Sequence, residues 1–168
     1  MATKFNEKNN HNAIEEKFFQ ICAQVLPTAG YGVYDIRYLS GSSTLRLFIT
    51  KANTVKGVDI NDCIKVDKLI SPFIENEDWI PGNFILEVSS PGLYRDIRFS
   101  DQLKYSLGDL IKIKFNSLID DKALKNKNIV VTLLEFDDSS MSVELEEEKQ
   151  KMIIKYDLIK SVNAELKI

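Results

Sequence analysis

The sequence predicts an α+β protein of two domains, an αββαβ two-layer sandwich followed by an all-β small barrel. Three observations predict this fold class. Two segments of the first half carry apolar residues at helical spacing, three other segments there alternate with period two, and from Gly108 onward only short strand-like segments follow. A chain of 168 residues is long enough for two such domains.

The first helix is predicted by apolar residues three and four positions apart, and Pro27 and Gly30 end it. These apolar positions are Ile14, Phe18, Ile21, Cys22 and Val25. Residues 31–39 and 44–51 are rich in β-favouring side chains. Because a Ser-Gly-Ser-Ser segment separates them, we expect a hairpin.

The second helix is expected to begin at Asp59, whose carboxylate can cap the free amides of the first turn, with Asp62 as the reciprocal partner of a capping box. Its expected buried stripe consists of Ile60, Cys63, Ile64, Ile70, Phe73 and Ile74. Pro72 lies within this pattern and predicts a stop or a kink just before it. A Pro-Gly turn at 81–82 then leads to the third strand, residues 83–89.

Alternate residues of the three strands should point to one face, which the two helices can cover. The residues expected on that face are Tyr34, Ile36, Tyr38, Leu45, Leu47, Ile49, Phe84, Leu86 and Val88. The opposite face should carry Asp35, Arg37, Arg46 and Glu87. These charges form either a ladder of surface ion pairs, which is the more ordinary interpretation, or a platform for a partner.

In the second half, residues 99–107 favour a short helical turn, and strands follow it. The expected strands are residues 110–115, 129–136, 142–146 and 151–154, with the closing segment 158–166 as a candidate fifth. Short strands joined by polar turns are typical of a small closed barrel of SH3-like or Sm-like type. The predicted organisation is a flexible leader at 1–12, an α/β domain at 13–90, a hinge at 91–100 and the barrel domain at 101–168.

Composition and motifs exclude several classes of protein. No apolar run is long enough for a transmembrane helix, and the polar first ten residues do not form a secretory signal, so we expect a cytoplasmic protein. Cys22 and Cys63 are expected to be buried free thiols, and with the single histidine, His11, they are too few for a zinc site. No nucleophile elbow, Ser-His triad or phosphate loop is present. We therefore predict no catalysis, no cofactor and no small-molecule substrate.

The charge pattern limits nucleic-acid binding to local patches. The net charge is −3, which does not suit a general polyanion binder. Basic residues gather at 112–114 and in the loop 122–127, and Arg95 and Arg98 flank the expected hinge. These lysines either keep the surface soluble or neutralise a few nucleic-acid phosphates.

One segment carries a family resemblance. Residues 86–93, Leu-Glu-Val-Ser-Ser-Pro-Gly-Leu, followed by Arg95, resemble the central signature of RimP, the ribosome maturation factor family. Residues 57–63, Gly32 with Tyr34-Asp35, Gly108 and residues 163–166 fit the family more weakly. The sequence departs from the signature at two positions, with Tyr94 where the family usually has Asp and Asp96 where it has Pro.

The resemblance implies an α/β N-terminal domain, an Sm-like C-terminal barrel and a monomeric factor that matures free 30S subunits in the cytoplasm. Its implied partners are small-subunit ribosomal proteins and 16S rRNA, with no membrane involved. The expected hinge residues are Ser89, Ser90, Pro91, Gly92 and Arg95. The candidate ribosome contacts are Arg37, Arg46, Arg98, Lys112, Lys114, Lys122, Lys125 and Lys127. The alternative function is a general RNA-binding regulator that uses the Sm-like barrel.

Overall fold

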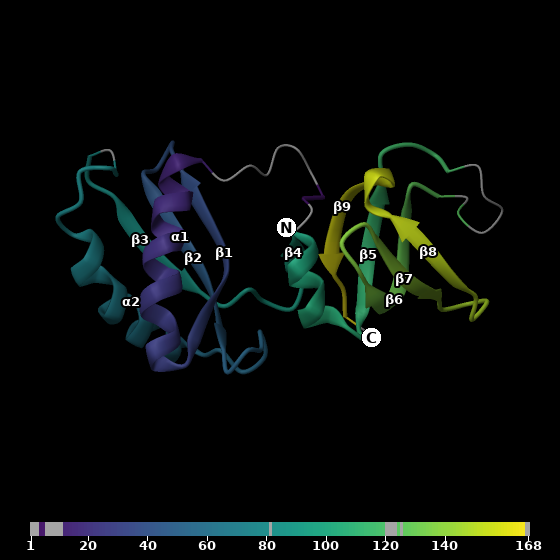
Figure 1. Cartoon of the computed structure of the whole chain (residues 1–168), viewed down its shortest axis with the longest axis horizontal. Helices are drawn as coiled ribbons and strands as arrows, with labels where there is room; N and C mark the ends of the chain where they lie inside the picture. The colour runs from purple at the N-terminus through teal and green to yellow at the C-terminus, as the bar shows by residue number, and fades with distance from the viewer. Residues whose placement is uncertain (1–3, 6–11, 81, 120–123, 125, 167–168) are drawn as a thin grey trace. The chain divides into compact units, whose positions relative to one another are not determined.

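The chain divides into two compact units, each with its own hydrophobic core. The computed structural model describes residues 4–5, 12–80, 82–119, 124 and 126–166 (Figure 1). The N-terminal unit is Asn10–Gly92, and the C-terminal unit is Leu93–Ile168 together with Met1–Asn9. The first unit combines helices with a sheet and the second is mostly strands, so the α+β class predicted from the sequence is confirmed.

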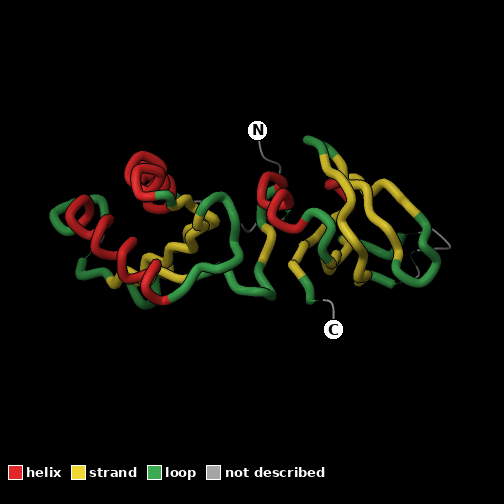
Figure 2. Tube along the Cα trace, turned by 90° about the horizontal axis from the view of Figure 1, so that it is seen from below, coloured by secondary structure: helices red, strands yellow, loops and turns green. Residues whose placement is uncertain are grey.

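The N-terminal unit follows the predicted order αββαβ. Its elements are α1 (Ala13–Val25), the 3-10 helix η2 (Leu26–Ala29), β1 (Tyr31–Leu39), β2 (Thr44–Lys51), α2 (Ile60–Ile74) and β3 (Ile85–Ser89). In the sheet, β2 lies between β1, to which it is antiparallel, and β3, to which it is parallel. Both helices contribute to the core that lies against one face of this sheet, with helices drawn red and strands yellow in Figure 2.

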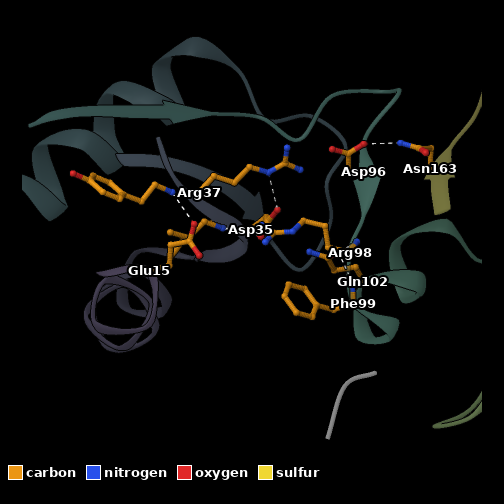
Figure 3. A network of polar contacts seen from close by, with 10 residues as sticks. Glu15, Asp35, Arg37, Asp96, Arg98, Phe99, Gln102 and Asn163 are labelled. Atoms are coloured by element: carbon orange, nitrogen blue, oxygen red, sulfur yellow. Dashed lines mark hydrogen bonds and ion pairs between the residues drawn. The ribbon is translucent and has the colours of Figure 1, made fainter. Parts of the chain in front are cut away.

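Helix α1 begins with a capping box that also ties it to the sheet. Asn12 Oδ1 accepts the amide of Glu15 at 2.9 Å, and Glu15 Oε2 accepts the amide of Asn12 at 3.0 Å. The other oxygen of Glu15 accepts the amide of Tyr38, on β1, at 2.8 Å (Figure 3). Gly30, at φ 81°, ends the helical segment in the left-handed conformation that glycine adopts without strain.

Helix α2 begins with the predicted capping box, in which Asp62 donates its amide to Asp59 Oδ1 and accepts the amide of Asp59, each at 3.0 Å. The expected stop at Pro72 is wrong, because the helix continues to Ile74. Pro72 removes only one amide donor, close to the end, and the amide of Glu75 still donates to the carbonyl of Ser71 at 3.1 Å.

The predicted buried stripe of α2 is wrong in part. Ile60, Ile64 and Phe73 are 70%, 46% and 50% exposed. The stripe that packs in the core consists of Cys63, Val66, Ile70 and Ile74. Asp62 explains this rotation: it is buried against Tyr31 and Lys51 of the sheet, and at about 100° per residue it lies on the opposite side of the helix from Ile64.

The sheet buries the face predicted for it, with one exception. Ile36, Leu45, Leu47 and Ile49 are fully buried under the helices. A β-bulge between Val33 and Asp35 changes the alternation of β1, so Tyr31 and Val33 pack on the core, and Tyr34 lies outside the cluster of described core residues. Gly32 is directly opposite Thr50, whose Oγ1 a Cβ at position 32 would approach to 2.7 Å.

Both cysteines are buried free thiols, as predicted. Burial raises the pKa of Cys22 to about 12. A thiol that stays protonated at neutral pH is a poor nucleophile, so Cys22 contributes to packing and not to chemistry.

The C-terminal unit is a six-stranded antiparallel sheet in the order β4-β9-β5-β6-β7-β8. Its elements are β4 (Asp96–Ile97), η3 (Ser100–Ser106), β5 (Leu110–Phe115), β6 (Asn128–Phe136), β7 (Ser140–Leu145), β8 (Lys151–Lys155), η4 (Tyr156–Leu158) and β9 (Ile159–Ala164). The helical turn and the strands were predicted, except for β4. The closed SH3-like or Sm-like barrel is not confirmed, because β4 and β8 remain unpaired edges among the described residues.

Phe5 belongs to the core of the C-terminal unit. It is 3% exposed, its ring lies edge-on to Tyr156 at 5.0 Å, and its amide donates to the carbonyl of Arg98 at 3.0 Å. The expectation of a flexible leader therefore does not hold at Phe5. The rest of the predicted leader, apart from Lys4 and Asn12, lies outside the described residues and includes His11. Within the described chain, no helix has the length and apolar character needed to cross a membrane.

Candidate functional site

The charges on the outer face of the N-terminal sheet are paired with one another. Register places Arg37 directly opposite Arg46, an arrangement that is repulsive by itself. Arg37 Nε lies 3.2 Å from Asp35 Oδ2 (Figure 3), and Arg46 Nε lies 2.8 Å from Glu87 Oε2 on β3. Each arginine therefore has a carboxylate that compensates its charge within the sheet.

Residues 90–95, which follow β3 and include most of the predicted hinge residues, form neither a helix nor a strand. Ser89 Oγ donates to the carbonyl of Ser90 at 3.1 Å, and Pro91 and Gly92 follow. Gly92 has φ 79°, and a Cβ there would meet no atom within 4 Å. Glycine is thus required at this position for its backbone conformation and not for lack of space.

Two arginines of the predicted hinge segment, Arg95 and Arg98, are almost completely buried. Arg95 is 7% exposed, and its Nη2 donates to the carbonyl of Tyr105 and to Ser106 Oγ, each at 2.7 Å. Arg98 is also 7% exposed, and its guanidinium lies over the ring of Phe99 at 5.5 Å. The hydrogen bonds of Arg95 favour a packing role for this residue over direct contact with phosphates.

The lysines of β5 lie on the outer face of the C-terminal sheet. Lys112 and Lys114 are exposed, whereas Ile111, Ile113 and Phe115 between and beside them are buried in the core. This alternation was predicted from the sequence. Of the predicted loop lysines, Lys127 is exposed, and Lys122 and Lys125 lie outside the described residues.

Lys112 and Lys114 line a hollow of about 470 Å³, which we call the β5 hollow. Its other walls come from β9, from the start of β6 and from the loop before β4. The lining residues are Tyr94, Lys112, Lys114, Asn128, Ser161, Asn163, Ala164 and Glu165. At its edge Asn163 Nδ2 donates to Asp96 Oδ1 at 2.6 Å, a bond that joins β9 to β4 (Figure 3).

Sequence reasoning found the two lysines of the β5 hollow but missed its other polar walls. These walls include Asn128 on β6 and Ser161 and Asn163 on β9. Only the pairing of β6 and β9 with β5 brings them beside the lysines. Antiparallel pairing places Ser161 and Asn128 on either side of Lys114. The signal that could have found Ser161 and Asn163 is their alternation with buried Val162 and Ala164.

A polar cluster around the buried Asp62 of the N-terminal unit was also missed. Asp62 accepts hydrogen bonds from the amide of Asp59 and from the Tyr31 hydroxyl, at 3.0 and 2.7 Å, and Lys51 Nζ lies 2.9 Å from it. The Asp59 amide, Tyr31 and Lys51 together lower the pKa of Asp62 to about 2, and the hydrogen bond to Asp62 raises the pKa of both Tyr31 and Lys51. Because the carboxylate is saturated with donors, this cluster holds α2 on the sheet.

Among the described residues, no group of three or more His, Cys, Asp or Glu side chains is arranged to hold a metal ion. The candidate site that the described residues do form is the polar β5 hollow on the C-terminal sheet. Residues 21–94 match the family model of the RimP N-terminal domain. The match runs from the middle of α1 to Tyr94 and includes the signature at residues 86–93. Residues 21–94 are therefore a RimP N-terminal domain, a domain that points to the ribosome maturation factor family.

Proposed function

We propose that this protein binds free 30S small ribosomal subunits and promotes their late assembly without catalysing a reaction. The observation that carries the proposal is the match of residues 21–94 to the RimP N-terminal domain. The exposed lysines of β5 add support, because unpaired cations on a sheet face suit rRNA phosphates. The proposed partners are small-subunit ribosomal proteins and 16S rRNA.

The proposal also covers the location, oligomeric state and domain organisation of the protein. It is a cytoplasmic monomer that needs no cofactor, and its α/β domain (13–90) and all-β domain (101–168) are linked by a hinge at 91–100. Of the candidate ribosome contacts, we give Lys112 and Lys114 the main role. Arg37 and Arg46 have carboxylate partners already, so they rank below the lysines.

A factor of this kind acts by binding one state of the particle better than another. Each tenfold preference for the native arrangement of a partly folded region shifts its equilibrium by about 1.4 kcal/mol. Binding energy alone is therefore enough to favour maturation, and no bond needs to be made or broken.

Sedimentation with purified small subunits tests the proposal. The protein should sediment with free 30S particles and be absent from assembled 70S ribosomes. Cells that lack the protein should accumulate immature 30S particles. If the protein remains in the supernatant with 30S particles at low salt, the proposal is wrong.

The linker can be tested with two glycines that have the same backbone conformation. Gly92 and Gly57 both have φ 79°, and a Cβ at either position meets no atom within 4 Å. Valine at either position should cost at least about 1–2 kcal/mol of backbone strain. We expect Gly92→Val to reduce 30S binding several-fold, because it changes the path of the chain between the units. Gly57→Val, inside the N-terminal unit, should leave the binding of the folded protein unchanged. Equal binding by the two variants would remove the hinge from the proposal.

The alternative is a general RNA-binding regulator that uses an Sm-like barrel, which would assemble into rings and bind free RNA tightly. It has less support, because the described strands of the C-terminal unit form a sheet that does not close into a barrel. Size measurement by light scattering separates the two: a monomer supports the maturation role, and a ring supports the regulator.

A further inference from the structure

We propose that the β5 hollow is a binding site for a single-stranded RNA segment, with phosphates held by Lys112 and Lys114 and one base stacked on Tyr94. This inference rests on the proposed function, because it assigns the rRNA contact of the protein to one surface. The residues that carry it come from three neighbouring strands and the loop before β4.

Strand register brings the polar groups together. Lys114 lies between Ser161 on β9 and Asn128 on β6, and Lys112 is directly opposite Asn163 on β9. Directly paired residues share one face of a sheet, with Cβ atoms about 5 Å apart. The core occupies the other face, so these side chains stand on the solvent side as a compact polar group.

Four of these side chains have no partner in the part of the chain that the structure describes. Among the described residues, Lys112, Lys114, Asn128 and Ser161 make no side-chain hydrogen bond or ion pair. A ligand can bind to them without breaking an internal contact, unlike Arg37 or Arg46, which would have to leave a carboxylate. Converging polar groups that are left unpaired are typical of a binding site.

The spacing of the lysines suits a chain of anions. Lys112 and Lys114 are two residues apart on an extended strand and therefore about 7 Å apart along it. Two cations at that separation can each meet one of two successive phosphates of a backbone that runs along β5. A compact ligand with a single anionic group would use only one of them.

Tyr94 supplies a surface for a base. It is 61% exposed at the rim of the hollow, where its side chain adds nothing to the core. An aromatic ring beside a basic strand is the usual platform on which unpaired bases stack. Because the bases of a duplex are already stacked, this geometry favours a single strand.

The remaining walls can contact the edges of a base. The amide of Asn128 can both donate and accept, and Asn163, whose Nδ2 is held by Asp96, can offer its carbonyl oxygen. Glu165 would repel a phosphate placed beside it, but its carboxylate can accept a hydrogen bond from an exocyclic amine such as that of cytosine. We therefore place the phosphates over the lysines and the base toward Glu165.

An acidic peptide suits the hollow less well. Peptides bind sheets by pairing with an open edge or by inserting apolar side chains into pockets. Strands β9, β5 and β6 are each paired on both sides, so they offer no open edge. Among the described lining residues, only Ala164 and the ring of Tyr94 offer apolar surface, and Glu165 would repel an acidic chain.

Fluorescence polarisation with a short labelled oligo(cytidine) tests the site in the full-length protein. The double variant Lys112→Gln/Lys114→Gln should weaken binding at least about tenfold at low salt and reduce the slope of log K against log salt by about 1.4. Tyr94→Ala should weaken binding at least about fivefold, and Tyr94→Phe should retain it.

The matched control is Lys151→Gln/Lys155→Gln on β8, which removes the same charge from the same sheet outside the hollow. It should change the affinity less than about twofold. The site is wrong if the wild-type protein does not bind the oligonucleotide at low salt, or if the control and the hollow variants lose affinity equally. It is also wrong if a poly-glutamate peptide binds with the same dependence on Lys112 and Lys114.

Sedimentation of the same variants with 30S particles separates this inference from the proposed function. If the wild-type protein sediments with 30S and the hollow variants do so equally well, the RNA site is wrong and the proposed function stands. If the wild-type protein binds oligo(cytidine) through the hollow but does not sediment with 30S, the proposed function is wrong and the RNA site stands.

Discussion

The two sheets of this protein have similar inner faces and different outer faces. In both units the inner face packs on a hydrophobic core. On the outer face of the N-terminal sheet, Arg37 and Arg46 have carboxylate oxygens 3.2 and 2.8 Å away. On the outer face of the C-terminal sheet, Lys112 and Lys114 have no such partner among the described residues.

This difference shows how basic residues on a sheet can serve either stability or binding. A paired cation must lose its carboxylate before it can bind a phosphate, so its net gain on binding is small. An unpaired cation on the surface gives little to the fold and keeps its full interaction for a ligand. This difference supports the proposal that the C-terminal sheet is the binding surface, and three substitutions or pairs of substitutions test the comparison.

The largest effects are expected from the inner faces. Phe115→Ala should lower the free energy of unfolding of the C-terminal unit by about 3–5 kcal/mol, and Leu47→Ala should lower that of the N-terminal unit by about 2–5 kcal/mol, because both side chains are almost completely buried. The single tryptophan, Trp79, lies in the N-terminal unit, so its fluorescence during urea unfolding reports that unit alone. Leu47→Ala should lower the tryptophan midpoint, and Phe115→Ala should leave it unchanged. A shift of that midpoint in Phe115→Ala would show that the two cores are not independent.

A smaller effect is expected from the pH dependence of the N-terminal unit. The pKa of Asp62 is about 2 in the folded protein and ordinarily 3.8, so the unfolded chain binds the proton more tightly. The stability that Asp62 provides is therefore complete above about pH 4 and is lost as the pH falls toward 2. In Asp62→Asn this part of the pH dependence should disappear from the tryptophan-detected urea midpoints. Parallel pH profiles for the two proteins would contradict the role of Asp62.

The smallest effect is expected from the paired outer face. Arg46 and Glu87 form an exposed ion pair, so Arg46→Gln or Glu87→Gln should change the free energy of unfolding by less than about 1 kcal/mol. Arg46→Gln should also change 30S binding less than about twofold, because the arginine is already paired. A loss of 30S binding as large as that of Lys112→Gln/Lys114→Gln would remove the distinction between the two sheets.

The elements were predicted well where short-range patterns decide them. The ranges of β1, β2 and β5 agree with the expected strands, and the capping box at Asp59 and Asp62 is present. These features depend on alternation and on contacts between residues three apart, which the sequence displays directly.

Predictions failed where distant contacts decide the result. The rotation of α2 depends on Asp62 meeting Tyr31 and Lys51, and the exposure of Ile60 and Ile64 follows from it. The alternation of β1 depends on a bulge that no local pattern reveals. In both cases the apolar residues of the element could bury either of two faces. Contacts with a neighbouring strand decide which face is buried.

By itself the sequence determined the α+β class, the order of the elements, the lysine alternation on β5 and the resemblance to RimP. Only the tertiary structure decided that the described C-terminal sheet does not close into a barrel and that the N-terminal arginines are paired with carboxylates. It also decided that the lysines of β5 have Tyr94, Asn128 and Ser161 beside them. The physical reason is the range of the interactions. Periodicity and caps act within a few residues of one another, whereas sheet pairing joins β5 to β9 across much of the C-terminal unit and so creates a surface that no single segment contains.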